Sequence, residues 1–193
     1  VEGSSYRREG ARMIVFESGV FDGGISGGCL EGDALKRSQL AIIKQEPAII
    51  TYDTSKELEI GIGLGCNGII DVLLRPLKPD SEVLAILEKC TKERRTHIIV
   101  TITASNLKQE ALQLGRSFYY DTENKKLEGM ESNEIKNFIL KKIDQVLEVN
   151  KSRSYVYTSD QETLNFQIEL IPAQYHIAIY GDNYDVYPLI ELA

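Results

Sequence analysis

The feature that most constrains this chain is a dense cluster of glycine around one cysteine, at residues 22–33. Five of these twelve residues are glycine, and Cys29 directly follows Gly27 and Gly28. Glycine permits positive φ and close backbone approach, but ordering it costs more chain entropy than ordering any other residue. A second island at residues 61–68 repeats the arrangement around Cys66. Two glycine loops that each carry a soft nucleophile are therefore the strongest indication of function.

The residues around the first island predict a strand, a glycine loop and then a helix. A short apolar run predicts a strand over 13–17, and apolar residues at helical spacing predict a helix over about 29–44. Cys29 would then lie at or near a helix N-terminus, where free amides and the helix dipole favour the thiolate. A thiolate binds soft metals or attacks sulfur. The alternative is that Cys29 is a small residue chosen for tight packing.

The second island lies between two expected strands, over residues 48–52 and 69–74. Cys66 is then in a loop just before a strand, so both thiols could reach one pocket, which is a hypothesis. Residues 1–12 form an expected polar loop, in which Ser5, Arg7 and Arg12 offer the donors that an anion such as a phosphate needs. The alternative for this segment is a solvated basic loop.

The remaining chain up to residue 171 mixes helices and strands. Strands are expected over 98–102, 117–121, 154–158 and 165–170, and the last two alternate as an antiparallel pair does. Helices are expected from residue 81 and over 132–148. Cys90 lies on the apolar stripe of the first of these helices, so we expect it in the core. Together these elements predict an α+β domain with mixed sheets over residues 1–171.

Pro172 marks an expected domain boundary. A strand over 176–180, Gly181 and a helix from Val186 resemble the start of a Rossmann-like α/β domain, which would be incomplete within residues 172–193. Only the first glycine of the dinucleotide fingerprint is present, and Asp182 and Asp185 would repel a pyrophosphate. We therefore do not expect NAD(P) to bind this chain alone.

Composition excludes several classes of function. A formal net charge of −7 argues against general nucleic-acid binding. No apolar run approaches the length of a membrane span, and three cysteines at irregular spacing suggest the reducing cytoplasm. His97 and His176 are expected to be structural, and neither zinc-type spacing nor a Ser-His-Asp set is evident. The carboxylates near the cysteines are expected to cap helices and bind loop amides; they are Asp22, Glu31, Asp33 and Asp71.

Three motifs resemble the XdhC/CoxI family, which are bacterial-type accessory and maturation proteins of xanthine dehydrogenase and carbon monoxide dehydrogenase. The motifs are GSSYRREGARM at 3–13, ISGGCLE at 25–31 and GLGCNG at 63–68. The resemblance covers nearly the whole chain. Residues 179–188 resemble the start of the family's C-terminal Rossmann domain, although relatives are richer in glycine there.

This resemblance implies a cofactor-insertion chaperone rather than an enzyme, although such proteins can carry the dehydrogenase's name. It would bind molybdenum cofactor (molybdopterin) transiently, assist its sulfuration and deliver it to an apo xanthine dehydrogenase-type molybdoenzyme. A sulfur-donating desulfurase is a further implied partner, and a homodimer is the default expectation. Cys29 and Cys66 are the candidate molybdenum contacts. The expected cofactor-binding residues are Cys29, Cys66, Gly27, Gly28, Glu31, Gly65, Asn67, Gly68, Ser5, Arg7 and Arg12.

Two other interpretations remain open. One is a nucleotide-dependent oxidoreductase, whose Rossmann half binds a nicotinamide nucleotide and whose cysteines carry electrons or sulfur. The other is a non-catalytic α+β module that binds the dehydrogenase. Replacing both cysteines by serine separates the three interpretations. Loss of cofactor binding with retained folding supports the chaperone, and loss of a thiol-dependent turnover supports the oxidoreductase. No effect on any activity leaves the interaction module.

Overall fold

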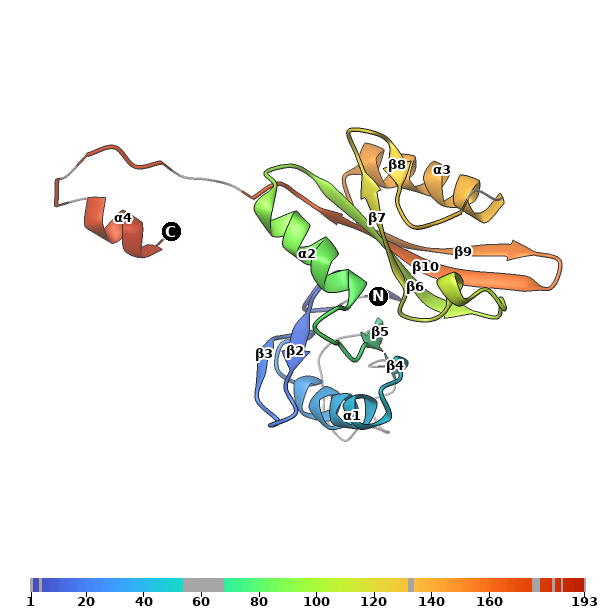
Figure 1. Cartoon of the computed structure of the whole chain (residues 1–193). Coiled ribbons are helices and arrows are strands. Elements are labelled where there is room, and N and C mark those ends of the chain that lie inside the picture. The colour runs from blue at the N-terminus through green and yellow to red at the C-terminus, as the bar shows by residue number, and fades with distance from the viewer. Residues whose placement is uncertain are drawn as a thin grey trace.

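Two lobes and a C-terminal arm make up the protein, as Figure 1 shows. The computed structural model describes residues 2–3, 5–53, 68–131, 134–174, 178–181, 183–184 and 186–192. The smaller lobe is formed by the described residues up to 77, and the larger lobe by the described residues within 82–171. Helices and several sheets occur together in the described residues, which confirms the predicted α+β class. The expected mixed sheets were wrong for this part of the chain, because each described strand pair is antiparallel.

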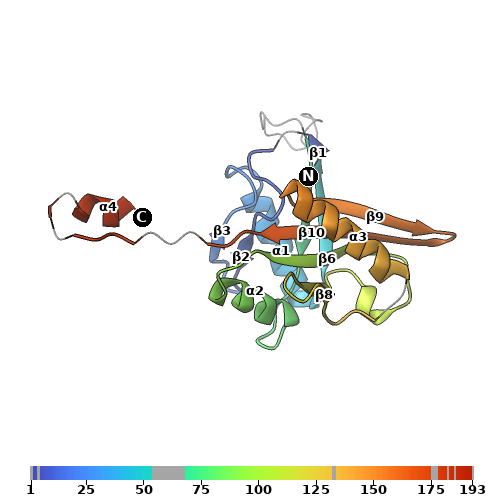
Figure 2. The same cartoon turned by 90° about the horizontal axis from the view of Figure 1, so that it is seen from above.

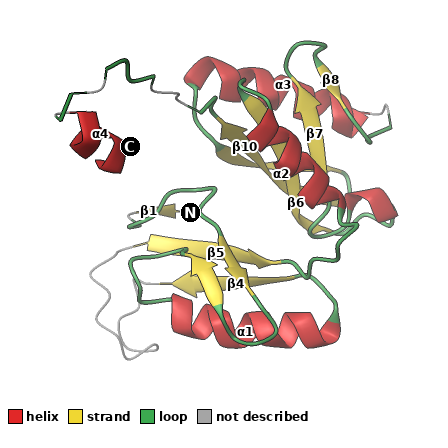
Figure 3. Cartoon of the chain, turned by 60° about the vertical axis from the view of Figure 1, so that its left-hand side comes forward, coloured by secondary structure: helices red, strands yellow, loops and turns green. Residues whose placement is uncertain are grey.

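The smaller lobe is a short antiparallel sheet covered by one helix. Its sheet has the strand order β1-β5-β4, and a separate two-stranded hairpin, β2-β3, lies beside it. Figure 3 shows the helix α1 running along β4 and β5. Their shared core consists of Leu30, Ala41, Ile50, Tyr52, Ile70 and Leu74. The elements are β1 (Glu2–Gly3), β2 (Met13–Val15), β3 (Phe21–Gly23), α1 (Glu31–Lys44), β4 (Ala48–Asp53) and β5 (Gly68–Leu74).

The larger lobe is a five-stranded antiparallel sheet with the order β8-β7-β6-β10-β9. Helix α3 packs on one face, where alternate residues of β6 and β10 meet Ile139 and Ile143. Helix α2 packs on the other face, through Ile86 and Cys90. The elements are α2 (Glu82–Lys92), β6 (His97–Ser105), the 3-10 turn η1 (Glu110–Leu112), β7 (Ser117–Asp121), β8 (Lys126–Leu127), α3 (Glu134–Val149), β9 (Arg153–Ser159) and β10 (Glu162–Ile171).

The element predictions hold well up to residue 171. Each strand and helix expected in this region is present, with ends shifted by a few residues. Strands β9 and β10 pair in antiparallel fashion, as their alternation indicated. Cys90 and His97 are both buried, which confirms their structural roles. The His97 ring contacts the Tyr119 hydroxyl at 2.9 Å and the Glu93 carbonyl oxygen at 3.1 Å.

Two arginines from the smaller lobe reach the larger one. Arg12 donates from Nη1 and Nη2 to both carboxylate oxygens of Glu169 on β10, at 2.7 and 2.6 Å. Gly10, at φ +92°, makes room for this pair, because a Cβ there would lie 2.8 Å from Glu169 Oε1. Arg75, just after β5, donates from Nη2 to Ser117 Oγ on β7 at 3.0 Å. The lobes therefore meet through polar contacts made by these two arginines.

The segment after Pro172 differs from expectation. Residues 178–180 form no strand, while residues 175–177, including His176, lie outside the described part. A helix does form, α4 (Val186–Leu192), and none of its residues is buried. Figure 2 shows the arm leading away from the end of β10. The strand prediction was wrong at 178–180 because a β-strand needs a neighbouring strand, and the described chain offers none there. That residues 172–193 begin a Rossmann-like domain stays a prediction.

Candidate functional site

The glycine loop before α1 is organised by one carboxylate, that of Glu31 in the first turn of the helix. Its Oε1 accepts hydrogen bonds from the backbone N–H groups of Ile25 at 3.0 Å and Ser26 at 2.7 Å. Its Oε2 accepts a short hydrogen bond from the Ser26 hydroxyl. Burial by itself would raise the pKa of Glu31, but the hydrogen bonds from Ser26 and Ile25 outweigh it, so the pKa lies below its usual value. The expectation that Glu31 binds loop amides is confirmed.

Ser26 is the second organising residue, and sequence reasoning missed it. Its buried hydroxyl accepts hydrogen bonds from the backbone N–H groups of Gly28 at 3.2 Å and Leu30 at 3.1 Å. It also lies 3.5 Å from the thiol of Cys29. Ser26 thus holds the turn of the loop just before the helix, while the helix itself has Leu30 as its N-cap residue. The available signal was the residue type, because serine side chains commonly bond to nearby backbone groups in turns.

Glycine is needed in this loop for two reasons: a positive φ at one position and close contacts at two others. Gly28 has φ +109°, and a Cβ there would meet no atom of the described residues within 4 Å. At Gly24 a Cβ would lie 3.2 Å from Glu31 Oε1. At Gly27 it would lie 3.3 Å from the ring of Tyr6, a residue that is 77% exposed. The loop thus presents bare backbone at Gly28 and an aromatic ring beside Gly27.

Cys29 lies where the sequence predicted, close to the start of α1. The helix begins at Glu31 with Leu30 as its N-cap residue, so Cys29 is the residue before the cap. Its side chain is half-buried and packs against the core of the smaller lobe. The side chain of Cys29 therefore contacts protein, while a Cβ on the neighbouring Gly28 would meet no described atom within 4 Å. Cys90, by contrast, is buried in the core between α2 and the larger sheet.

The three candidate anion-binding residues are divided between two places. Arg7 lies at the loop, where its Nε donates to the carbonyl oxygen of Ser26 at 3.1 Å. Ser5 is adjacent and donates its hydroxyl to the carbonyl oxygen of Arg7. The side chain of Arg12 pairs with Glu169 instead. Of the two predicted arginines, Arg7 therefore bonds to the glycine loop, and a role of Arg12 toward an external anion stays a prediction.

The second predicted motif is described only at its end. Gly68 is buried at the start of β5, where it pairs with Gly3 of β1. Gly65, Cys66 and Asn67 lie outside the described residues, so the convergence of the two thiols stays a hypothesis. Among the described residues, no group of three or more histidine, cysteine, aspartate and glutamate side chains could hold a metal ion.

Other carboxylates near the loop are also engaged. Asp33 accepts hydrogen bonds from Arg37 at 2.7 Å and from the Tyr52 hydroxyl at 2.8 Å. Burial and the neighbouring Asp33 raise the pKa of Tyr52 well above its usual value, so this phenol stays protonated. Asp71 accepts a hydrogen bond from Thr51 at 2.6 Å across the β4-β5 pair. Asp33 and Asp71 therefore bond to neighbouring side chains, and the expectation that they cap helices or bind loop amides was wrong for these two.

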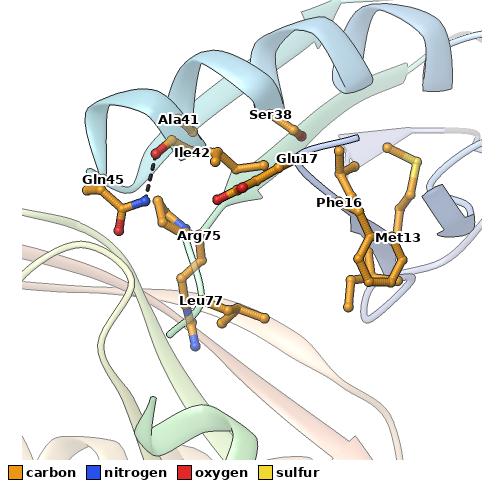
Figure 4. Close-up of a pocket in the computed structure, with 12 residues that line it drawn as sticks. Met13, Phe16, Glu17, Ser38, Ala41, Ile42, Gln45, Arg75 and Leu77 are labelled. Atoms are coloured by element: carbon orange, nitrogen blue, oxygen red, sulfur yellow. Dashed lines mark hydrogen bonds between the residues drawn. The ribbon is translucent and has the colours of Figure 1, made fainter. Parts of the chain in front are cut away.

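A separate cavity of about 290 Å³ lies between α1 and the hairpin (Figure 4). Ser38, Ala41 and Ile42 of α1 line it, together with Gln45 just after the helix, residues 13–17 and Arg75, Pro76 and Leu77. None of these residues belongs to the glycine loop. Burial, with the charge of Arg12 nearby, lowers the pKa of Arg75 to about 10, and its Nε has no acceptor among the described residues.

Fold and site together define an α+β domain whose smaller lobe carries a capped glycine loop and a half-buried thiol at a helix start. Residues 1–53 match the sequence profile of the XdhC and CoxI family. This confirms the family resemblance over the segment that holds the first two of the three motifs. In the part that the structure describes, no helix is both long and apolar enough to cross a bilayer.

Two similar proteins carry xanthine dehydrogenase names. A curated relative from Bacillus subtilis (strain 168), named as one probable subunit of xanthine dehydrogenase, is 37% identical over 99 residues, which cover 50% of this chain and 26% of the relative. A crystal structure described as a xanthine dehydrogenase from Bacillus halodurans is similar with a TM-score of 0.51 and 29% identity, covering 70% of this chain and 40% of that one. The chain thus spans about a quarter of the curated relative's length.

Proposed function

We propose that this protein is an accessory protein of a xanthine dehydrogenase-type molybdoenzyme, and that it binds the molybdenum cofactor and assists its sulfuration and insertion. The observation that carries the proposal is the glycine loop, whose backbone is held by Glu31 and Ser26 and whose Gly28, next to the half-buried Cys29, has room for a Cβ among the described residues. A preorganised loop loses little conformational freedom when a ligand binds. The family match and the names of the similar proteins support an accessory role.

The loop's groups match the chemistry of the cofactor, which is the cargo of this protein. Molybdenum with sulfur is a soft centre that suits thiolate ligands, and the pterin carries a phosphate and a flat heterocycle. Cys29 supplies a thiol, and the loop backbone at Gly27 and Gly28 lets a flat group approach closely. Arg7 supplies a cation for the phosphate. The exposed ring of Tyr6 offers a stacking surface beside them.

The second motif would complete the site. Cys66 would supply a second thiol, and Gly65, Asn67 and Gly68 would shape the other wall. A sulfur-donating desulfurase would provide the sulfur, and the apo molybdoenzyme would receive the loaded cofactor. Because the chain covers 26% of its curated relative, the partners of the whole protein belong to this proposal.

Anaerobic cofactor binding tests the proposal. The purified protein is mixed with released molybdenum cofactor, and co-eluting molybdenum and pterin are measured. We expect binding by the wild type and by Cys90→Ser, since Cys90 is far from the loop, and loss of binding in Cys29→Ser and Cys66→Ser. Arg7→Met should weaken retention of the pterin. Absence of binding by a wild-type protein with a native circular dichroism spectrum would overturn the proposal.

The same variants separate the alternatives. A nucleotide-dependent oxidoreductase would show turnover of a nicotinamide nucleotide that Cys29→Ser abolishes. A non-catalytic interaction module would capture the apo dehydrogenase equally well with and without the two thiols. Either result, in the absence of cofactor binding, would replace the proposed function.

A further inference from the structure

We propose that two copies of this chain pair along strand β9 and form one continuous antiparallel sheet. β9 is the last strand of the five-stranded sheet, so β10 covers only one of its two edges. Figures 1 and 2 show the β9-β10 turn projecting beyond the end of α3. Among the described strands, none pairs with the second edge of β9. A seven-residue edge therefore presents unpaired backbone donors and acceptors.

The sequence of β9, RSYVYTS, contains none of the usual devices that protect an edge. It has no proline and no lysine, and its one charge, Arg153, stands at the first position. Its register with β10 is continuous from residue 153 to residue 159, so no bulge twists the edge away. Val156 in the middle is 56% exposed. β-Branched and aromatic residues of this kind favour strand pairing.

The backbone geometry selects one register. The two-residue turn at Asp160 and Gln161 pairs Ser159 with Glu162, and alternation then directs the free N–H and C=O groups of Ser154, Val156 and Thr158 to the open edge. An antiparallel copy centred on Val156 places Val156 opposite its own counterpart and Ser154 opposite Thr158. Each of these pairs can exchange two backbone hydrogen bonds, so the symmetric register uses every free group of the strand.

The charges at the two ends of β9 are complementary in this register. Lys151 and Arg153 stand at the start of the strand, and Asp160 follows its end, all exposed. Antiparallel pairing places Asp160 of one copy opposite Ser152 of the other, between Lys151 and Arg153. This charge contact occurs twice, once at each end of the interface, because the dimer is symmetric. Opposite charges at such positions stabilise a strand pair, and like charges destabilise it.

A second copy is the occupant that this edge fits. Because the strand is complementary to itself in both pattern and charge, a two-fold axis through Val156 closes the assembly at two chains. The other edge of the sheet, β8, has two residues, which is too short to extend the array. The inference does not depend on cofactor binding.

Two charge-reversed variants test the pairing. Variant one is Lys151→Glu with Arg153→Glu, and variant two is Asp160→Lys. Alone, each variant places like charges beside one another, so analytical ultracentrifugation should show self-association at least about tenfold weaker than in the wild type. Mixed together, the variants place opposite charges at both ends of the interface and should form a mixed dimer of nearly wild-type affinity. Added salt should weaken that mixed dimer.

A backbone variant provides an independent test. Val156→Pro removes the N–H at the open edge while leaving the bonds to β10, a position where edge strands accept proline. It should be monomeric, whereas its control, Val156→Thr, should still dimerise. Circular dichroism checks that each variant is folded. A wild type that is monomeric at all concentrations, or variants that dimerise equally well alone and mixed, would overturn the proposal.

Discussion

Replacing Glu31 by glutamine tests how the glycine loop is held. The Glu31 carboxylate accepts three hydrogen bonds, from the N–H groups of Ile25 and Ser26 and from the Ser26 hydroxyl. A glutamine of the same shape can still accept from the two amides through its carbonyl oxygen. Its NH₂ group, however, faces a serine oxygen that already accepts from Gly28 and Leu30. The serine hydroxyl proton then loses its acceptor.

The expected loss of stability follows from these contacts. Hydrogen bonds to a charged group contribute about 1.5–3 kcal/mol to stability, whereas those between neutral groups contribute about 0.5–1.5 kcal/mol. Replacing the carboxylate by a neutral amide therefore weakens each of the three bonds by about 1 kcal/mol. Glu31 is 8% exposed, so solvent replaces little of this. We therefore expect Glu31→Gln to lower the free energy of unfolding by about 2–4 kcal/mol at pH 7. The control is Glu88→Gln in an exposed pair with Lys92, where we expect little change.

The effect should depend on pH in a defined direction. The folded-state pKa of Glu31 is lowered, so its stabilisation is fully present above the unfolded pKa, about 4.3, and is lost as pH falls through the folded pKa. The difference between wild type and Glu31→Gln should therefore shrink below about pH 4. Urea unfolding followed by circular dichroism measures it, and hydrogen exchange at Ile25 and Ser26 localises it. A loss at pH 7 no larger than that of Glu88→Gln would refute this account of the loop.

Three further predictions concern single residues. Gly28→Ala should lower the free energy of unfolding by about 1–2 kcal/mol, because Gly28 has φ +109°. Gly32→Ala, inside α1 and with no described atom near its Cβ position, should raise the free energy of unfolding by about 1 kcal/mol. Thermal unfolding compares the two variants. Arg12→Met should lower the free energy of unfolding by about 1–3 kcal/mol, because it leaves the buried Glu169 carboxylate unpaired. Arg75→Met removes a buried cation whose Nε has no acceptor among the described residues, so it should leave stability in urea unchanged or raise it. Iodoacetamide should modify Cys29 faster than Cys90 in peptide mass mapping, because burial raises the pKa of the Cys90 thiol; equal rates would contradict this.

Local patterns predicted most of the fold. The apolar stripe of α3 and the alternation of β9 and β10 can be read from residues close together in the sequence. This spacing determines which face of each helix or strand is apolar and therefore packs in the core. The position of Cys29 at the start of α1 followed in the same way, and so did the loop-binding role of Glu31. The strand expected over 176–180 is not formed at 178–180, the described part of that range, because a strand depends on a partner that lies elsewhere in the chain.

The sequence by itself determined the α+β class, the family resemblance and the glycine loop with its cysteine. Glycine spacing and the hydrophobic period involve residues close together in the sequence, so they can be recognised before any tertiary contact is known. Only the tertiary structure decided that the Ser26 hydroxyl accepts from the Gly28 and Leu30 amides, that Tyr6 lies on Gly27, and that Arg12 binds Glu169. Arg12 and Glu169 are separated by 157 residues. Which of several arginines meets a distant carboxylate depends on how the lobes pack, and no local pattern encodes that geometry.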